Sequence, residues 1–342
     1  MKICFASLRF DDKLSGQTNS IKNIIKEISK FHDVHILGLA DSKKKNQFLK
    51  DINHFLGIFR FIRHLRKNVD NYDIIHLQLP TPAFSIVGDL IKTKVKIIVQ
   101  FDSIVIDEPL LKILKMSLKY DFFFYFFRIL FNNKYITRLL SRFKADHYVV
   151  ASQYQKDQLV NDFRISSNRI SQIPNFVDDK FVRIDKKRAR KIFGFKQSDF
   201  IITYIGHILH HKGIYDVVKS FKKRKNAKGS QTSKLIIASS NLGNLNRIKK
   251  MNVPNIIYFG KINVAHLLSA SDVLHVSYVY SFGTSWYPSI LLEALKVGIR
   301  TMTTDIPLTR EIIKGGKTFN QVSKKKSIQK LINVYDKQKT IL

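Results

Sequence analysis

The amino-acid sequence predicts an α/β protein made of two Rossmann-like domains that face each other across a cleft. Short apolar runs, typical of strands buried in a parallel sheet, alternate with stretches whose apolar residues recur at helical spacing. The alternation stops at Ile173-Pro174-Asn175 and restarts near Phe200. The chain has 342 residues, which is enough for two domains of ordinary size.

The first domain, predicted over residues 1–177, begins with an apolar strand from Ile3 to Leu8. The next apolar residues occur at i, i+3, i+4 and i+7, which places them on one helix face: Ile21, Ile24, Ile25 and Ile28. Ser152 is a suitable N-cap for a later helix. The other elements expected here are strands at 34–39, 74–77, 95–101 and 147–151 and a helix at 48–59.

The second domain, predicted over residues 178–342, starts with a polar, basic stretch that runs to Lys191. The expected strands are 200–205, 234–238, 256–259, 273–276 and 300–303, and the expected helices are 214–221, 264–270 and 288–295. Two domains of this kind favour a ligand bound at the carboxyl ends of both sheets.

The composition excludes several classes of protein. Hydrophobic residues make up 44% and charged residues 25%, which excludes a disordered or fibrous chain. The single cysteine, Cys4, excludes a disulfide framework and a cysteine-based metal site. We find neither a secretory signal nor a good transmembrane span, so we expect a cytoplasmic protein that is soluble or peripheral to a membrane.

The net charge of +33 predicts attraction to anions such as nucleic acid, anionic lipid or phosphorylated substrates. An AT-rich coding sequence, which favours lysine, is the alternative explanation. Both halves are basic, so no detachable tail accounts for the charge. Zinc-finger spacing, an RNP-like aromatic strand and a basic zipper are all missing from the sequence, which disfavours nucleic-acid binding.

The segment 110–143 departs from the alternation because aromatic and basic residues are interleaved there, including six consecutive aromatic residues from Phe122 to Phe127. Such a segment can lie on an anionic membrane with its rings at the headgroup level. The alternative is that the rings pack in the core of the first domain. The density of charge favours the membrane.

Three places have the residues for binding a nucleotide. Gly16 lies between a strand and a helix, where free amides suit a phosphate. Gly206 and His207 end another strand, and Lys212 precedes the next helix as a point charge for a diphosphate. Glu293 lies early in an apolar helix, where it either interacts with the helix dipole or accepts hydrogen bonds from ribose hydroxyls. His207, His210 and His211 have no nearby carboxylate or cysteine at ligand spacing, which disfavours a metal.

A series of ordered motifs resembles the GT4 family of glycosyltransferases, whose fold is GT-B. The motifs, in chain order, are Tyr72-Asp73-Ile74-Ile75-His76, Ala145-Asp146-His147-Tyr148-Val149-Val150, Ile173-Pro174-Asn175, Tyr204-Ile205-Gly206, Lys212-Gly213, Ser271-Asp272-Val273 and Leu292-Glu293-Ala294. The resemblance implies retaining transfer of a sugar from a nucleotide-diphosphate donor, without a metal or another cofactor. The donor would bind mainly to the second domain and the acceptor mainly to the first.

The resemblance also assigns roles to residues. Lys212, helped by His207 and by amides near Gly16, would hold the diphosphate, and Glu293 would hold the ribose as the second glutamate of the family's E-x7-E motif. Three positions depart from the family: Ser285 replaces the first glutamate, His207 replaces an arginine, and Asp102 aligns with a histidine after the fourth strand. The family's closing helix, which crosses back to the first domain, corresponds to Ile328–Val334.

We therefore expect a hexosyltransferase that acts at the cytoplasmic membrane face on a lipid-linked or polysaccharide acceptor. The departures at Ser285 and Asp102 leave open a catalytically weak or noncatalytic module that binds a nucleotide sugar or a partner enzyme. Nucleic-acid binding is a third, less favoured hypothesis.

Overall fold

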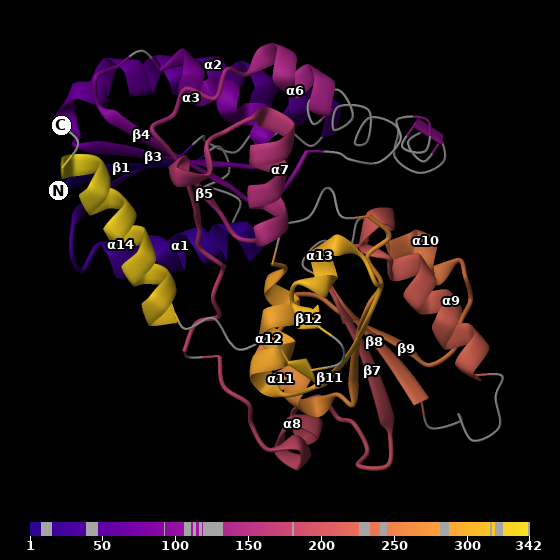
Figure 1. The fold of residues 1–342 in the computed structure, drawn as a ribbon. Helices are drawn as coiled ribbons and strands as arrows, with labels where there is room; N and C mark the ends of the chain where they lie inside the picture. The colour runs from indigo at the N-terminus through magenta and orange to yellow at the C-terminus, as the bar shows by residue number, and fades with distance from the viewer. Residues whose placement is uncertain are drawn as a thin grey trace. The chain divides into compact units, whose positions relative to one another are not determined.

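The computed structural model describes residues 1–7, 16–38, 47–91, 93–105, 133–179, 181–225, 233–239, 245–280, 287–314, 317–318 and 324–340, and a few positions between 111 and 118. The chain divides into two compact units (Figure 1). Unit 1 contains Met1–Asn175 and Val322–Leu342, and unit 2 contains Phe176–Ser281 and Tyr287–Gln321. The first division lies two residues before the predicted boundary. The segment Val322–Leu342 falls within the predicted second domain but belongs to unit 1, as the family's closing helix implied for Ile328–Val334.

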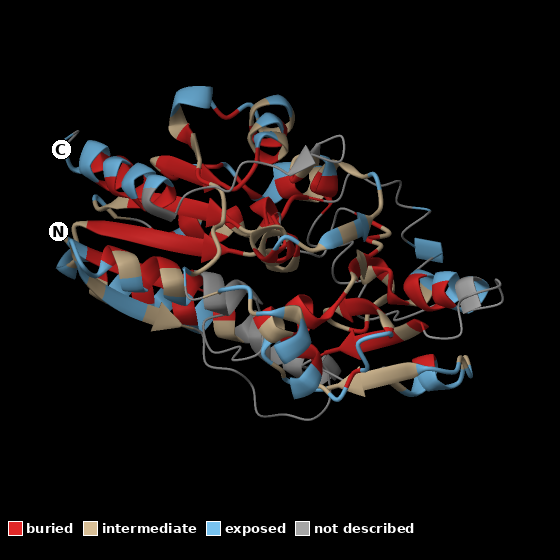
Figure 2. Cartoon of the chain, turned by 90° about the horizontal axis from the view of Figure 1, so that it is seen from below, coloured by how far each residue is buried: buried red, intermediate tan, exposed pale blue. Residues whose placement is uncertain are grey.

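Unit 1 contains a parallel sheet in the order β2-β1-β3-β4-β5-β6. Its strands are β1 (Lys2–Ser7), β2 (Asp33–Gly38), β3 (Ile74–Leu79), β4 (Lys96–Phe101), β5 (His147–Val150) and β6 (Ile170–Gln172). The inner strands are buried, whereas the edge strand β2 is partly exposed (Figure 2). The predicted strands of this domain are confirmed to within two residues at most ends, and β6 is an additional strand.

The helices of unit 1 are α1 (Gly16–Ile28), α2 (Gln47–Asn68), α3 (Ile86–Leu90), α6 (Lys134–Leu140), α7 (Gln153–Phe163) and α14 (Lys324–Thr340). The four isoleucines predicted to share one face of α1 are all buried. The predicted cap is also confirmed, because Ser152 Oγ accepts from Gln155 N at 3.0 Å and Gln155 Oε1 accepts from Ser152 N at 3.2 Å.

The last helix, α14, packs on unit 1 beside α1 (Figure 1). Its buried stripe has helical spacing: Ile328, Leu331, Ile332 and Tyr335. Tyr335 is fully buried, and its hydroxyl lies 2.5 Å from His76 Nδ1 on β3. Ser327 Oγ donates to the Pro174 carbonyl at 3.1 Å. These contacts explain why the chain's end belongs with its beginning.

Unit 2 contains a parallel sheet in the order β11-β10-β7-β8-β9, and its five strands are the ones that the sequence predicted. Its strands are β7 (Phe200–Ile205), β8 (Ser233–Ala238), β9 (Ile256–Phe259), β10 (Val273–Val276) and β11 (Arg300–Thr303), and a short hairpin follows with β12 (Ile313–Lys314) and β13 (Lys317–Thr318). Its helices are α8 (Lys186–Ile192), α9 (Ile214–Lys225), α10 (Leu245–Lys249), α11 (Val264–Ala270), α12 (Ser289–Val297) and α13 (Pro307–Arg310). Helix α8 is an additional element, which lies at the end of the polar, basic stretch that runs to Lys191.

Three aspartates fasten the starts of parallel strands in the same way. Asp73, Asp146 and Asp272 each donate a backbone amide to a carbonyl of the neighbouring strand at 2.8–2.9 Å. The carboxylate of each accepts from the amide of that same neighbouring residue at 2.7–2.9 Å. Three of the motifs that carry the family resemblance therefore close the ends of the sheets and have a structural role.

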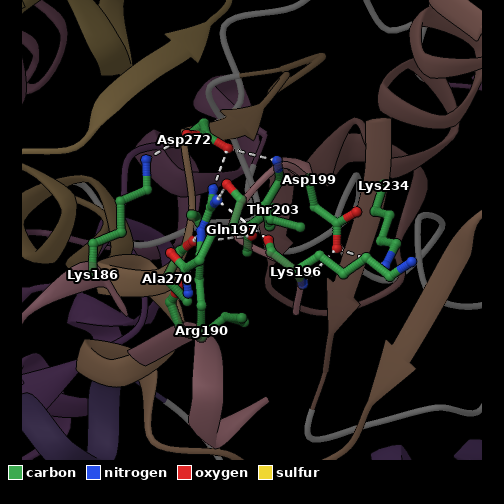
Figure 3. A network of polar contacts seen from close by, with 12 residues as sticks. Lys186, Arg190, Lys196, Gln197, Asp199, Thr203, Lys234, Ala270 and Asp272 are labelled. Atoms are coloured by element: carbon green, nitrogen blue, oxygen red, sulfur yellow. Dashed lines mark hydrogen bonds and ion pairs between the residues drawn. The ribbon is translucent and has the colours of Figure 1, made fainter. Parts of the chain in front are cut away.

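Asp272 also anchors helix α8 to the sheet of unit 2 (Figure 3). Its two carboxylate oxygens form ion pairs with Lys186 Nζ at 2.5 Å and with the Arg190 guanidinium at 2.9 Å. Arg190 is 3% exposed and donates further hydrogen bonds to the backbone carbonyls of Ala270 and Gln197. Its buried charge is therefore compensated on several sides, as a buried guanidinium requires.

No helix in the described part of the chain is long and apolar enough to cross a membrane.

Candidate functional site

The candidate site of unit 2 lies at the switch point of its sheet. Strand β7 comes first in the unit, the chain then adds β8 and β9 on one side, and β10 and β11 extend the other side. The segments that follow β7 and β10 therefore diverge at adjacent carboxyl ends, which is the usual place for a ligand in an open α/β sheet. Gly206 to Gly213 follow β7, and Ser277 and Tyr278 follow β10.

The backbones of these two segments are in close contact at Gly213 and Ser277. Gly213 has a φ of +73°, and a Cβ on it would lie 1.5 Å from the Ser277 carbonyl oxygen. A glycine is therefore required there for both conformation and space. The Val279 amide donates to the His211 carbonyl at 3.0 Å, which holds the two segments together.

Lys212, Tyr278 and Glu293 form the centre of the site. Lys212 is half-buried, and its Nζ lies 5.3 Å from the centroid of the Tyr278 ring. Tyr278 is 3% exposed, and its pKa is raised by burial and by the negative charge of Glu293. One buried ring thus contacts the cation and interacts with the carboxylate. The sequence analysis did not identify Tyr278, although an aromatic residue two positions after a predicted strand was a usable signal.

Glu293 is a half-buried acid inside helix α12 rather than a helix cap. It is the fifth residue of α12, which has no acidic residue in its first turn. Burial raises the pKa of its carboxyl to about 7. The dipole interpretation is therefore disfavoured, and the carboxylate is suited to accept hydrogen bonds from hydroxyl groups of a ligand.

Gly206 and His207 lie between β7 and the Lys212 segment. Gly206 has a φ of +155°, which few other residues adopt. The Tyr204 hydroxyl donates to the His207 carbonyl at 2.8 Å and fixes the turn, and His207 itself is half-buried. Among the described residues, no three His, Cys, Asp or Glu side chains form a group that could hold a metal ion.

Two predicted site residues lie in unit 1, and one lies outside the described residues. Gly16 is the first residue of α1. Asp102 directly follows β4, and its carboxylate accepts from Gln78 Nε2. Ser285 lies outside the described residues. The structure thus brings Gly206, His207, Lys212 and Glu293 together within unit 2, and Gly16 and Asp102 are parts of unit 1.

Two family models match the chain over nearly its whole length. Glycosyltransferase Family 4 matches residues 14–181, and Glycosyl transferases group 1 matches residues 185–340. Among curated proteins, N-acetyl-alpha-D-glucosaminyl L-malate synthase of Bacillus anthracis is 28% identical over 156 residues, 44% of this chain. The capsular polysaccharide biosynthesis glycosyltransferase CapM of Staphylococcus aureus is 23% identical over 226 residues, 60% of this chain. The matches span 39% and 57% of these two relatives.

Solved structures agree in fold. HepE of Anabaena in complex with UDP-glucose is 15% identical with a TM-score of 0.65, over 99% of this chain and 91% of that one. A glycosyltransferase of Rickettsia africae is 14% identical with a TM-score of 0.68, over 98% of each chain. The two family models and the two parallel sheets together identify this chain as a member of glycosyltransferase family 4 with the GT-B fold.

Proposed function

We propose that the protein is a retaining hexosyltransferase that takes a sugar from a nucleotide-diphosphate donor and passes it to a lipid-linked or polysaccharide acceptor. The observation that carries this proposal is the group of Lys212, Tyr278 and Glu293 at the switch point of unit 2. HepE, which has the same fold, binds UDP-glucose. CapM belongs to capsular polysaccharide biosynthesis.

The site residues have complementary roles in this reaction. The Lys212 ammonium neutralises the diphosphate and stabilises the negative charge that develops on it as the sugar leaves. The Glu293 carboxylate accepts hydrogen bonds from the two ribose hydroxyls. His207 adds a hydrogen bond, and a full charge only when it is protonated.

The experiment compares Lys212→Ala with Lys222→Ala, which removes an exposed lysine from α9 of the same unit. Release of nucleotide diphosphate from a panel of UDP- and GDP-sugars is measured with a glycan acceptor. Loss of one preorganised cation at the leaving group should lower turnover by roughly 10²-fold. Equal turnover in the two variants contradicts the proposal. Nucleotide binding without any turnover in the natural chain favours the noncatalytic alternative.

We propose in addition that unit 1 contacts an anionic membrane surface at the cytoplasmic face through helix α6. Tyr135 and Leu139 lie four residues apart, on one face of the helix, and are 73% and 84% exposed. Arg142 and Lys144 are exposed just beyond the helix. Exposed rings and aliphatic side chains beside cations suit a bilayer with negative headgroups. The six aromatic residues Phe122–Phe127 lie outside the described residues.

Vesicle sedimentation tests this surface. The natural chain should bind vesicles that contain phosphatidylglycerol and should bind pure phosphatidylcholine weakly. Leu139→Glu should reduce the binding. Val182→Glu makes the same kind of change at an exposed apolar residue of unit 2, so it should leave the binding unchanged. Equal loss in both variants contradicts a specific role for α6.

A further inference from the structure

The segment that carries Tyr278 is fixed by backbone hydrogen bonds on both of its sides. The Tyr278 carbonyl accepts from Thr304 Oγ1 at 2.5 Å, just beyond the end of β11. On the other side, the Val279 amide donates to the His211 carbonyl at 3.0 Å, in the segment that follows β7. Tyr278 itself is 3% exposed. It therefore holds one position at the carboxyl ends of three neighbouring strands before any ligand binds.

The ring of Tyr278 contacts the ammonium of Lys212. The distance of 5.3 Å from Nζ to the ring centroid is within the range in which a cation is attracted to the negative face of an aromatic ring. Burial of the ring strengthens this attraction, because less water competes for the cation. Lysine has a flexible four-carbon stem, so contacts of this kind decide where its ammonium lies. The ring thus restricts the cation that the proposed function places at the diphosphate.

A carboxylate interacts with the same tyrosine. The negative charge of Glu293 adds to the effect of burial in raising the pKa of Tyr278. Among the described residues Glu293 forms no ion pair, and burial is the cause of its own raised pKa. The ammonium and the carboxylate therefore interact with one ring without pairing with each other. This arrangement leaves the cation for a diphosphate and the acid for a ribose.

From these contacts we infer that Tyr278 is a positioning residue that acts through Lys212, because its ring holds the ammonium where the leaving diphosphate develops its charge. The inference rests on the proposed sugar transfer and adds to it a residue that contributes by orientation. An ammonium already in place needs no reorganisation as the charge develops, which is the condition for strong electrostatic stabilisation. Loss of the ring should therefore lower turnover while Lys212 is present and have no effect once Lys212 is absent.

The first variant is Tyr278→Met, which removes the ring and keeps a long apolar side chain. Turnover should fall about tenfold, the effect expected when a buried cation loses an aromatic contact, and less than in Lys212→Ala. Tyr278→Phe keeps the ring, so it should restore turnover to within about threefold of the natural chain. The measurement is release of nucleotide diphosphate from the panel of donor sugars.

A double-mutant cycle with Lys212→Ala tests whether Tyr278 acts through the lysine. In the Lys212→Ala background, Tyr278→Met should lower turnover no further, because the cation that the ring holds is already gone. A residue with a purely structural role would cause the same fractional loss in both backgrounds. Losses that multiply in the double variant would therefore overturn the inference.

Tyr258→Met is the matched control. Lys249 Nζ lies 5.9 Å from the centroid of the Tyr258 ring, a contact of the same kind at the edge strand β9 of the same unit. Its turnover should equal that of the parent chain in both backgrounds. Thermal unfolding of each variant shows whether the change at the buried position 278 disturbs the fold. Where Tyr278→Met unfolds at a clearly lower temperature, pentafluorophenylalanine at position 278 replaces it, since fluorine keeps the ring and removes the negative charge of its face. Turnover equal to that of Tyr278→Phe would then refute the role of the ring.

The outcomes separate this inference from the proposed function. If the natural chain transfers sugar and Tyr278→Met does so equally well, the role of Tyr278 is refuted while the transferase stands. If the natural chain binds UDP without turnover, the same cycle is measured on the dissociation constant of UDP, because Lys212 holds the diphosphate in a binding module too. If the natural chain neither binds nor transfers, the proposed function fails, and this inference fails with it.

Discussion

With the proposed role of Glu293 at the ribose, its raised pKa predicts that nucleotide binding depends on pH. Burial raises the pKa of this carboxyl to about 7, so near neutral pH the free protein holds it half protonated. Ribose hydroxyls donate best to the ionised form, which accepts through both oxygens. Binding of the donor should therefore release a proton, and affinity should increase as pH rises through 7.

The size of this effect follows from the ionised fraction. With a pKa of about 7, that fraction is about 9% at pH 6 and about 91% at pH 8, so the dissociation constant should fall about tenfold, or ~1.4 kcal/mol. Folding responds in the opposite direction. The native chain binds this proton more tightly than the unfolded chain, so the contribution of Glu293 to stability is present at low pH and is lost between pH 4.5 and 7.

Calorimetric titration with UDP-glucose at pH 6, 7 and 8 measures the dependence, because a nucleotide sugar has no phosphate that titrates in this range. Buffers of different ionisation enthalpy report the released proton directly. Glu293→Gln should bind more weakly at pH 8 and lose the rise in affinity between pH 6 and pH 8. Asp216→Asn, which removes an exposed carboxylate of α9, should keep the natural slope. A natural chain with equal affinity at pH 6 and 8 would refute the assignment of Glu293 to the ribose.

Three further predictions concern the framework around the site. Gly213→Ala should lower the free energy of unfolding in urea by more than about 3 kcal/mol, because the new Cβ clashes with the backbone of Ser277. Gly194 has a φ of +68° and open space around it, so Gly194→Ala should lower the free energy of unfolding by about 1 kcal/mol. Arg190→Met should lower the free energy of unfolding by about 3 kcal/mol, because it leaves the partly buried carboxylate of Asp272 without its guanidinium. Lys186→Met, which removes the 42% exposed lysine of the same ion-pair group, should lower it by under about 1 kcal/mol. Equal losses in the two variants would contradict this ranking. Burial lowers the pKa of His76 to about 3, so below pH 6.5 the unfolded chain binds a proton that the folded chain does not. The free energy of unfolding of unit 1 should therefore decrease by about 2 kcal/mol between pH 7 and pH 5. His76→Gln should reduce that acid sensitivity in thermal unfolding.

The sequence predicted the order of strands and helices because each element carries its own periodic signal. Strands such as β7 and helices such as α1 need only local pattern and burial. The buried polar residues of the unit 1 sheet escaped prediction because His76, Gln78 and Gln100 are single residues within apolar runs. Their contacts depend on partners in other elements, namely Tyr335 and Asp102.

The attachment of α14 to unit 1 could not be predicted from pattern alone. Its amphipathic stripe fits the surface of either unit, and the choice rests on contacts more than 150 residues away in sequence, to Pro174 and His76. The candidate site shows the same limit. Lys212 could be predicted because it is a charged residue next to a glycine, and Glu293 because it is a charged residue in an apolar helix. Tyr278 interacts with both of them but is uncharged, so the sequence carries no comparable indication of it.

The motifs that carry the family resemblance divide into two physical kinds, and only one of them bears on activity. The aspartates at 73, 146 and 272 fasten strand ends and would be needed by a catalytic or a noncatalytic chain alike. Lys212 lies in the segment that follows β7, over the ring of Tyr278, and Glu293 interacts with the same tyrosine. The departure at His207, which lies in the same segment as Lys212, belongs to this second kind. Family membership and correct folding therefore do not decide between transferase and binding module; the pH dependence of Glu293 and the turnover of Lys212→Ala do.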